Sequence, residues 1–181
     1  LRRAVPVLQD GQADQLDTLR TALLLLHARR ATVPDSLRLE NTHPFRATRL
    51  GRDWAFCHNG SVEDLDCLRP APGLVPQGGT DSERLFHHFL SELTESGSPR
   101  SALAATIAVP RSFTALHCLA ASSGLLLAAA CRHPDKSLPE YHALWLGEGP
   151  GVRVVASEPV DGMECDWARL PEPGVITLEV E

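Results

Sequence analysis

The amino-acid sequence predicts a single α+β domain, with two helices in the middle of the chain and strands before and after them. Three observations lead to this fold class. The 181 residues are 43% hydrophobic, which is enough for one domain with its own core. Two helical patterns follow each other in the middle, and short strand patterns separated by turn residues fill most of the second half. No linker or internal repeat divides the chain, and the order of elements is typical of sheets covered by helices rather than of a βαβ repeat.

The N-terminal part of the sequence indicates one helix and two strands. Residues 13–19 have two leucines three positions apart among polar residues, which predicts a short amphipathic helix. Residues 23–32 pass from four leucines to the polar stretch HARRAT, which predicts a buried strand whose C-terminal end reaches a surface or cleft. Residues 54–58 form a second strand, and the following Asn59-Gly60 dipeptide turns readily because both residue types tolerate positive φ.

The middle of the chain carries the two helices. Residues 82–94 place their large apolar side chains on one stripe at helical spacing. Thr80 followed by Glu83 has the pattern of a capping box, so we expect this helix to begin just after Thr80. Residues 101–109 have a weaker helical pattern, which Pro110 ends.

The second half is predicted to be mostly antiparallel sheet. Residues 113–121 and 125–131 form a β-hairpin around the turn sequence Ser-Ser-Gly. Three further strands are expected at residues 141–146, 152–157 and 175–180.

Charge and composition exclude several classes of protein. The formal net charge is -6, and the sequence has no block of consecutive basic residues that would form a positive surface for nucleic acid or anionic lipid. Neither partner is therefore expected. No apolar run approaches the roughly 20 residues that cross a bilayer, and the start lacks a signal peptide, so we expect a cytoplasmic protein. Five scattered cysteines fit reduced thiols better than a disulfide framework.

Four short stretches carry the functional signal: HARRAT (27–32), NTHPF (41–45), WAFCHNGSV (54–62) and GGTDSERL (78–85). In composition, order and spacing they resemble the class II glutamine amidotransferases, a branch of the N-terminal nucleophile hydrolases. A fifth stretch, VVASEPVDG (154–162), with Trp167 and LPEPGVITLEV after it, resembles the tail of small stand-alone members. These are related to the ergothioneine-pathway γ-glutamyl hydrolase and the glutathione-degrading amidotransferase-like proteins. The resemblance implies a four-layer αββα sandwich of two mostly antiparallel sheets between helices.

The resemblance assigns the oxyanion hole to Asn59 and Gly60. Amide hydrolysis passes through a tetrahedral oxyanion, so it needs a nucleophile, a base and donors aimed at the developing charge. The residue types agree with this role, because the Asn59 amide donates without ionisation and Gly60 lets the backbone approach a ligand closely. The alternative is that the dipeptide is only a turn.

The resemblance assigns substrate binding to Arg29, Thr32 and Asp81. A guanidinium for a carboxylate and a carboxylate for an ammonium match the α-amino acid head group of glutamine or a γ-glutamyl compound. If residues 23–32 form a strand, Arg29 shares a face with His27, whereas Arg30 and Thr32 share the other. The alternatives are a solvated arginine pair and a helix-capping Asp81.

Histidines are expected to support the site rather than to carry protons. The base of the family is the free α-amine of an N-terminal cysteine, so His43 and His58 are interpreted as structural neighbours of the site. His87 and His88 are adjacent on a helix and cannot both face one metal in the usual i, i+4 manner. We therefore expect no metal and no cofactor.

The nucleophile of the family is missing from this sequence. Residue 1 is Leu1, and the first cysteine is Cys57. Cys57 is on the opposite strand face from His58 and has no free α-amine, so a buried thiol is expected. We expect the nucleophilic cysteine in an N-terminal segment ahead of Leu1, which makes the domain of residues 1–181 inactive alone.

The expected reaction is hydrolysis of the side-chain amide of glutamine or a γ-glutamyl compound through a cysteinyl thioester. Because the sequence ends at Glu181, soon after the last predicted strand, a stand-alone hydrolase is favoured over one that passes ammonia to a synthase. The alternatives are a non-catalytic amino-acid-binding or scaffold subunit and an unrelated α+β domain. The substrate is a small molecule. The sequence leaves open the leaving amine and any partner subunit or homo-oligomer.

Overall fold

The computed structural model describes residues 2–5, 9–11, 13–29, 37–138 and 142–180. Its helices and strands confirm the α+β class with two antiparallel sheets. In chain order, with η for a 3-10 helix, they are η2 (Ala13–Thr18), η4 (Leu39–Asn41), β1 (Phe45–Arg49), β2 (Arg52–Asn59), η5 (Leu65–Cys67), α1 (Asp81–Ser96), α2 (Pro99–Ala108), β3 (His117–Ser122), β4 (Leu125–Ala130), β5 (Trp145–Gly149), β6 (Val152–Ala156), β7 (Asp166–Arg169) and β8 (Gly174–Glu179).

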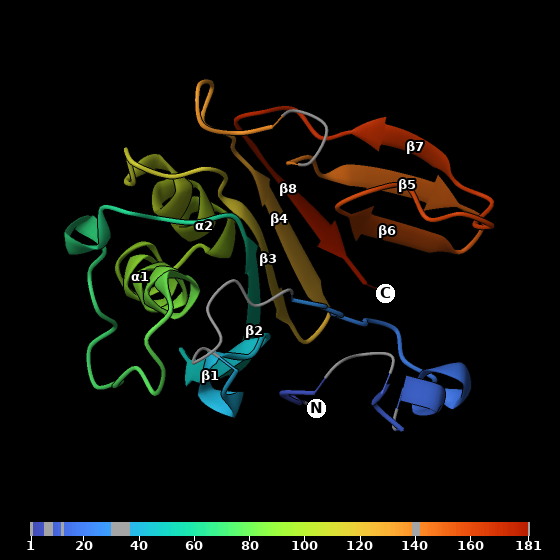
Figure 1. The fold of residues 1–181 in the computed structure, drawn as a ribbon, viewed down its shortest axis with the longest axis horizontal. Helices are drawn as coiled ribbons and strands as arrows, with labels where there is room; N and C mark the ends of the chain where they lie inside the picture. Colours follow the sequence, from blue (N-terminus) through green and yellow to red (C-terminus); the bar gives the residue numbers. More distant parts are fainter. Residues whose placement is uncertain (1, 6–8, 12, 30–36, 139–141, 181) are drawn as a thin grey trace.

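The elements stack in layers (Figure 1). The larger sheet has the strand order β1-β2-β3-β4-β8, and the smaller sheet has the order β6-β5-β7. Helix α1 packs against β1 and β2, and α2 packs against β4 and β8, so both α-helices lie on the larger sheet. The smaller sheet packs on the opposite face of the larger one, through side chains such as Leu146 and Val155. The described residues therefore supply the helical layer of one side and both sheets.

Strand alternation separates two kinds of packing on the larger sheet. On β2, Trp54 and Phe56 point toward α1, where they contact Phe86 and Phe89 with ring centroids 5.4–6.0 Å apart. All four rings are at most 2% exposed. Burying each such ring stabilises the fold by roughly 1.5–3 kcal/mol, so this aromatic layer fixes α1 on the sheet.

Helix α1 begins where the sequence predicts, and α2 begins at Pro99, two residues before its predicted start. The Thr80 hydroxyl accepts from the backbone N of Glu83, which confirms Thr80 as the N-cap of α1. The Glu83 carboxylate accepts from the backbone N atoms of Gln77 and Gly78, both at 2.7 Å, so it orders the preceding loop. Ser98 caps α2, and Pro99 is its first residue.

The predicted hairpin is confirmed, with one shift. Strands β3 and β4 pair from Cys118–Ala129 to Ser122–Leu125, and Gly124 has the positive φ of 70° that the turn requires. The predicted first strand began at Phe113, but residues before His117 pair elsewhere, with Val62 bridging Phe113. Strands β6 and β8 lie near their predicted positions, whereas β5 begins at Trp145, four residues after the predicted start. Strands β1 and β7 were not predicted.

One N-terminal prediction was partly right and one was wrong. The predicted short helix is present at Ala13–Thr18 as a 3-10 helix, but its Leu16 is 43% exposed, so it does not bury an apolar side. The described part of the predicted strand, residues 23–29, is extended but has no strand assignment. Leu23 and Leu25 are half-buried against the face of the larger sheet toward the smaller one, whereas Leu24 and Leu26 are 53% and 65% exposed. The alternation is that of a strand, but no described strand pairs with this segment.

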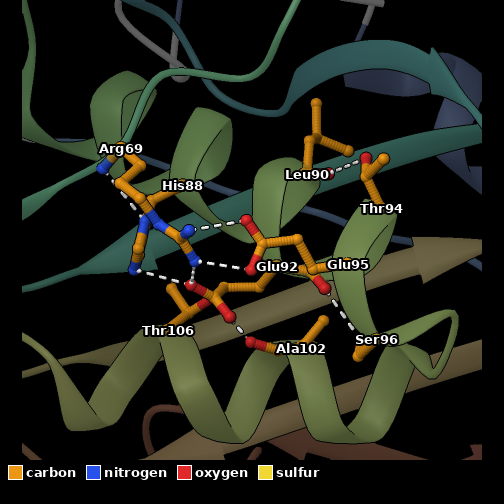
Figure 2. Close-up of polar contacts among 9 residues, drawn as sticks. All are labelled: Arg69, His88, Leu90, Glu92, Thr94, Glu95, Ser96, Ala102 and Thr106. Atoms are coloured by element: carbon orange, nitrogen blue, oxygen red, sulfur yellow. Dashed lines mark hydrogen bonds and ion pairs between the residues drawn. The ribbon is translucent and has the colours of Figure 1, made fainter.

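A polar cluster ties the loop after β2 to the outer side of α1 (Figure 2). The Arg69 guanidinium pairs with the carboxylates of Glu92 and Glu95. The Arg69 backbone N donates to Nδ1 of His88 at 3.0 Å, so the neutral His88 ring carries its proton on Nε2, which lies 3.6 Å from Glu92. The loop is thus held by one buried histidine and two ion pairs.

The two carboxylates of this cluster should contribute unequally. The Glu92 side chain is 14% exposed and lies near both Arg69 and His88, whereas that of Glu95 is 57% exposed. Since exposed ion pairs contribute little, Glu92→Gln should lower the melting temperature more than Glu95→Gln. Thermal unfolding followed by circular dichroism checks this order, and equal effects would show that burial of Glu92 adds nothing.

None of the helices in the described ranges has the length and apolar character needed to cross a membrane.

Candidate functional site

A cavity of about 2220 Å³ lies between the two sheets and the extended segment at residues 21–29. Its lining includes predicted site residues from all four N-terminal motifs, namely Arg29, His43, His58, Asn59, Gly60 and Asp81. Arg30 and Thr32 lie outside the described residues. The predicted placement of Arg29 and Arg30 on opposite strand faces therefore stays a prediction. The structure therefore brings together side chains that are far apart in the sequence.

His58 anchors the end of β2 to α1. Its Nε2 lies 3.1 Å from the Ala115 carbonyl oxygen and its Nδ1 lies 3.0 Å from the Ser82 hydroxyl. A carbonyl can only accept a hydrogen bond, so the neutral ring donates from Nε2 to Ala115. Its Nδ1 accepts a hydrogen bond from the Ser82 hydroxyl. Burial lowers the pKa of His58, while the Asp81 carboxylate and the Ala115 carbonyl oppose this shift. A neutral His58 thus links the end of β2 to the start of α1 and to the segment before β3.

Asn59 is on the cavity side of β2. Trp54, Phe56 and His58 point toward the helices, so alternation sends Cys57 and Asn59 to the opposite face. Both residues line the cavity. The Cys57 thiol is only 3% exposed, and burial raises its pKa to about 12, which confirms the prediction of a buried thiol.

Gly60 has a structural reason to be glycine. Its φ is 130°, and a Cβ at this position would lie 1.9 Å from the Ala115 carbonyl oxygen. The next residues pair with the segment that precedes β3, since Ser61 N donates to Thr114 Oγ1 at 3.0 Å and Thr114 N donates to Ser61 O at 2.9 Å. The turn after β2 is therefore rigidly held beside the cavity.

Asp81 is the first residue of α1 and holds the same turn. Its Oδ2 accepts from the backbone N of Val62 at 2.8 Å. The carboxylate also lies at the N-terminus of α1, where the helix dipole favours a negative charge. The predicted binding residue thus has a structural contact as well as a position on the cavity wall.

The motifs NTHPF and GGTDSERL fix each other. The Asn41 side-chain oxygen accepts from the backbone N of Gly79 at 3.1 Å. A Cβ on Gly78 would lie 2.3 Å from that oxygen, so this position also needs glycine. With Glu83 bound to the same loop, the backbone leading into Asp81 has little freedom.

Arg29 has two neutral imidazoles for neighbours. The rings of His27 and His43 are in contact, with centroids 4.1 Å apart and planes tilted by 32°, and His43 also contacts Phe45. Burial lowers the pKa of His43 to about 2, and the nearby His27, His58 and Arg29 add to this effect. Burial likewise lowers the pKa of His27. Arg29 itself is exposed at the cavity lining, so it supplies cationic charge beside uncharged rings.

The sequence did not indicate three polar residues of the cavity wall, Thr114, His117 and His142. His117 is the direct partner of Asn59 across β2 and β3. No motif marks these residues, and the register of β2 and β3 is what places His117 beside Asn59. Among the described residues, no group of three or more histidine, cysteine or carboxylate side chains is arranged to hold a metal ion.

Comparison with known proteins gives one family match. The family profile of the class II glutamine amidotransferases matches residues 12–126. Two curated relatives, from Haemophilus influenzae and Escherichia coli (strain K12), are named "Putative glutamine amidotransferase", the latter with the suffix YafJ. They are 33% identical over 100 residues and 35% identical over 77 residues, which is 50% and 42% of this chain. The matches span only 33% and 29% of these relatives' lengths.

Solved structures share the fold. A predicted glutamine amidotransferase from Pseudomonas aeruginosa superimposes with a TM-score of 0.62 at 22% identity, over 84% of this chain and 68% of that one. Glutamine phosphoribosylpyrophosphate amidotransferase from B. subtilis gives a TM-score of 0.60 at 21% identity, over 84% of this chain and 32% of that one. At these identities the likeness concerns the fold, and it supports the N-terminal nucleophile hydrolase architecture.

The buried histidines predict acid sensitivity. The pKa of His43 is about 2 in the folded chain and 6.5 ordinarily, and that of His117 is about 4. Below pH 6.5 the unfolded chain binds more protons, so the free energy of unfolding should fall as pH decreases, by up to about 1.4 kcal/mol per pH unit for each histidine. For His117 the decrease ends near pH 4.

The variant His43→Phe should reduce this slope, measured by urea denaturation between pH 7 and 4. Phe45→Leu, which changes packing without removing a titrating group, should lower stability equally across the range. An unchanged slope in His43→Phe would show that His43 is not held neutral.

Proposed function

Because the chain belongs to the class II glutamine amidotransferases, we propose that it binds glutamine or a γ-glutamyl compound and takes part in hydrolysis of the side-chain amide. The supporting observation is that Arg29, Asn59, Gly60 and Asp81 line one cavity. These residues come from three separate motifs, and they combine the donors and charges that such a substrate requires.

The proposed head-group site uses two opposite charges. The Arg29 guanidinium binds the α-carboxylate, because its planar fork matches a carboxylate in a bidentate manner. The Asp81 carboxylate binds the α-ammonium. One of its oxygens, Oδ2, accepts from the backbone N of Val62, and the carboxylate still has further acceptor sites for the ammonium. Thr32 is proposed as a further substrate-binding residue from the same motif as Arg29.

The proposed oxyanion hole consists of the Asn59 side-chain amide and the Gly60 backbone N–H. The rigid turn supports this proposal, because donors fixed before the reaction need no reorganisation as charge develops. The pairing with Thr114 and the close approach to Ala115 provide that rigidity.

The proposed nucleophile is an N-terminal cysteine that these 181 residues do not include. Its thiol attacks the amide carbon, and its own α-amine takes the thiol proton and passes it to the leaving amine. The C–N bond breaks, a thioester forms, and water releases the γ-carboxylate. We further propose that the protein is cytoplasmic.

A first test uses residues 1–181 alone. Residues 1–181 should release no ammonia from glutamine and should not react covalently with a glutamine analogue that carries an electrophilic side chain. A coupled ammonia assay and intact mass spectrometry check both points. Ammonia release that survives Cys57→Ser would contradict the proposed nucleophile.

A second test uses the protein that carries its N-terminal cysteine. Arg29 binds a carboxylate that is charged in both the ground state and the transition state, so Arg29→Met should raise KM by the equivalent of about 2 kcal/mol. Asn59 binds a charge that exists only in the transition state, so Asn59→Ala should lower kcat by about 10²–10³-fold with little change in KM.

The matched control is Arg30→Met, which we expect to be near neutral because the resemblance assigns the substrate carboxylate to Arg29 and not to Arg30. If Arg30→Met raises KM and Arg29→Met does not, the assigned arginine is wrong. If Asn59→Ala keeps its kcat, the oxyanion proposal must be abandoned. Glutamine binding without turnover in the protein with its cysteine would indicate the alternative, a non-catalytic binding subunit.

A further inference from the structure

His117 lies beside Asn59 on the wall of the cavity. The two residues are register partners on the antiparallel strands β2 and β3, so their side chains share a face. Directly opposite residues have Cβ atoms about 4.5–5.5 Å apart. Leu119 and Ala121, on the same face of β3, pack with the smaller sheet, and His117 lines the cavity with Asn59 and Gly60.

His117 is a buried polar group that has no hydrogen-bond partner. Its side chain is 0% exposed, and neither ring nitrogen makes a hydrogen bond within the described residues. Burial lowers the pKa of His117 to about 4, so at neutral pH the ring is uncharged and has one donor and one acceptor. A buried donor or acceptor without a partner costs about 1–3 kcal/mol, so a ligand that supplies the partner gains affinity.

Glu172 lies beside one of the two ring nitrogens of His117. One oxygen of Glu172 accepts from Arg132 Nε at 3.0 Å, which holds the carboxylate in place. The other oxygen lies 3.7 Å from Nε2 of His117. A carboxylate favours the tautomer that carries the proton on the facing nitrogen, and Nδ1 is then an acceptor.

The proposed oxyanion hole places the substrate amide near this acceptor. If the amide oxygen is bound by Asn59 and Gly60, the nitrogen of the same amide is only about 2.2 Å from that oxygen, given standard C=O and C–N bond lengths. The residue directly across from Asn59 is therefore close enough to contact the amide nitrogen. His117 occupies that position.

We propose that His117 accepts a hydrogen bond from the N–H of the amide to be cleaved, and that Glu172 is the positioning residue that keeps the required tautomer. This inference rests on the proposed function of the same cavity. It assigns His117 a role in distinguishing amides from γ-glutamyl esters, which have no N–H at this position.

The tautomer can be measured without a ligand. Nitrogen-15 NMR of the histidine rings at pH 7 should show a neutral His117 protonated on Nε2, and Glu172→Gln should shift the ring toward a mixture of tautomers. A charged His117, or a proton on Nδ1 in the unmodified protein, would overturn the inference. An unchanged tautomer in Glu172→Gln would remove Glu172 from it.

The contact can be measured by binding to residues 1–181, which needs no nucleophile. Calorimetry should give dissociation constants for glutamine and for glutamate γ-methyl ester with the unmodified chain and with His117→Phe. We expect His117→Phe to weaken glutamine binding about fivefold, the equivalent of one neutral hydrogen bond, and to leave ester binding within twofold.

The matched control is His87→Phe, which replaces another buried histidine with an unpartnered ring nitrogen, on α1 and outside the cavity lining. It should change neither constant. If His117→Phe weakens both ligands equally or neither, the inference fails while the proposed function stands. If the unmodified chain binds neither ligand, the proposed function fails and this inference with it.

Discussion

The site depends on one close approach of two backbone segments, at Gly60 and Ala115. The Ala115 carbonyl occupies the space that any side chain at position 60 would need, and the same carbonyl accepts from His58. From this point the turn after β2 is fixed on both sides, by pairing with Thr114 and by the bond from Val62 to Asp81. A larger residue at position 60 would therefore displace the strand end, the start of α1 and the cavity wall together.

Much of what the family motifs encode is support for this junction. Asn41 and Glu83 satisfy backbone N–H groups of the loop that leads into α1, and Ser82 completes the bonding of His58. These residues hold the backbone of the loop and the His58 ring in place, whatever ligand the cavity holds. Asn59 and Arg29 line the cavity and are the residues proposed to contact the substrate.

The sequence predicted the local elements well and the contacts between distant segments poorly. The α1 stripe, its Thr80 cap and the turn at Gly124 follow from short-range rules, and the structure confirms them. Residues 23–29 look like a buried strand by composition, but a strand needs a partner, and periodicity does not reveal whether one is present. His117 was missed for the same reason, because its position opposite Asn59 follows only from the register of β2 and β3. The sites of Arg29, Asn59 and Asp81 came from the resemblance, since each alone is compatible with an ordinary turn, cap or surface charge.

The two faces of the larger sheet separate stability from ligand choice, and this has a consequence for the evolution of the domain. The aromatic contacts with α1 are all on one face, whereas the cavity is bounded on the other face by β6 and the loops of the smaller sheet. Exchanges along Val152–Ala156 that spare Val155, which packs against the larger sheet, can reshape the cavity wall and leave the Trp54–Phe89 layer untouched. A lineage can thus change the lining of its cavity while the contacts that fix α1 stay the same.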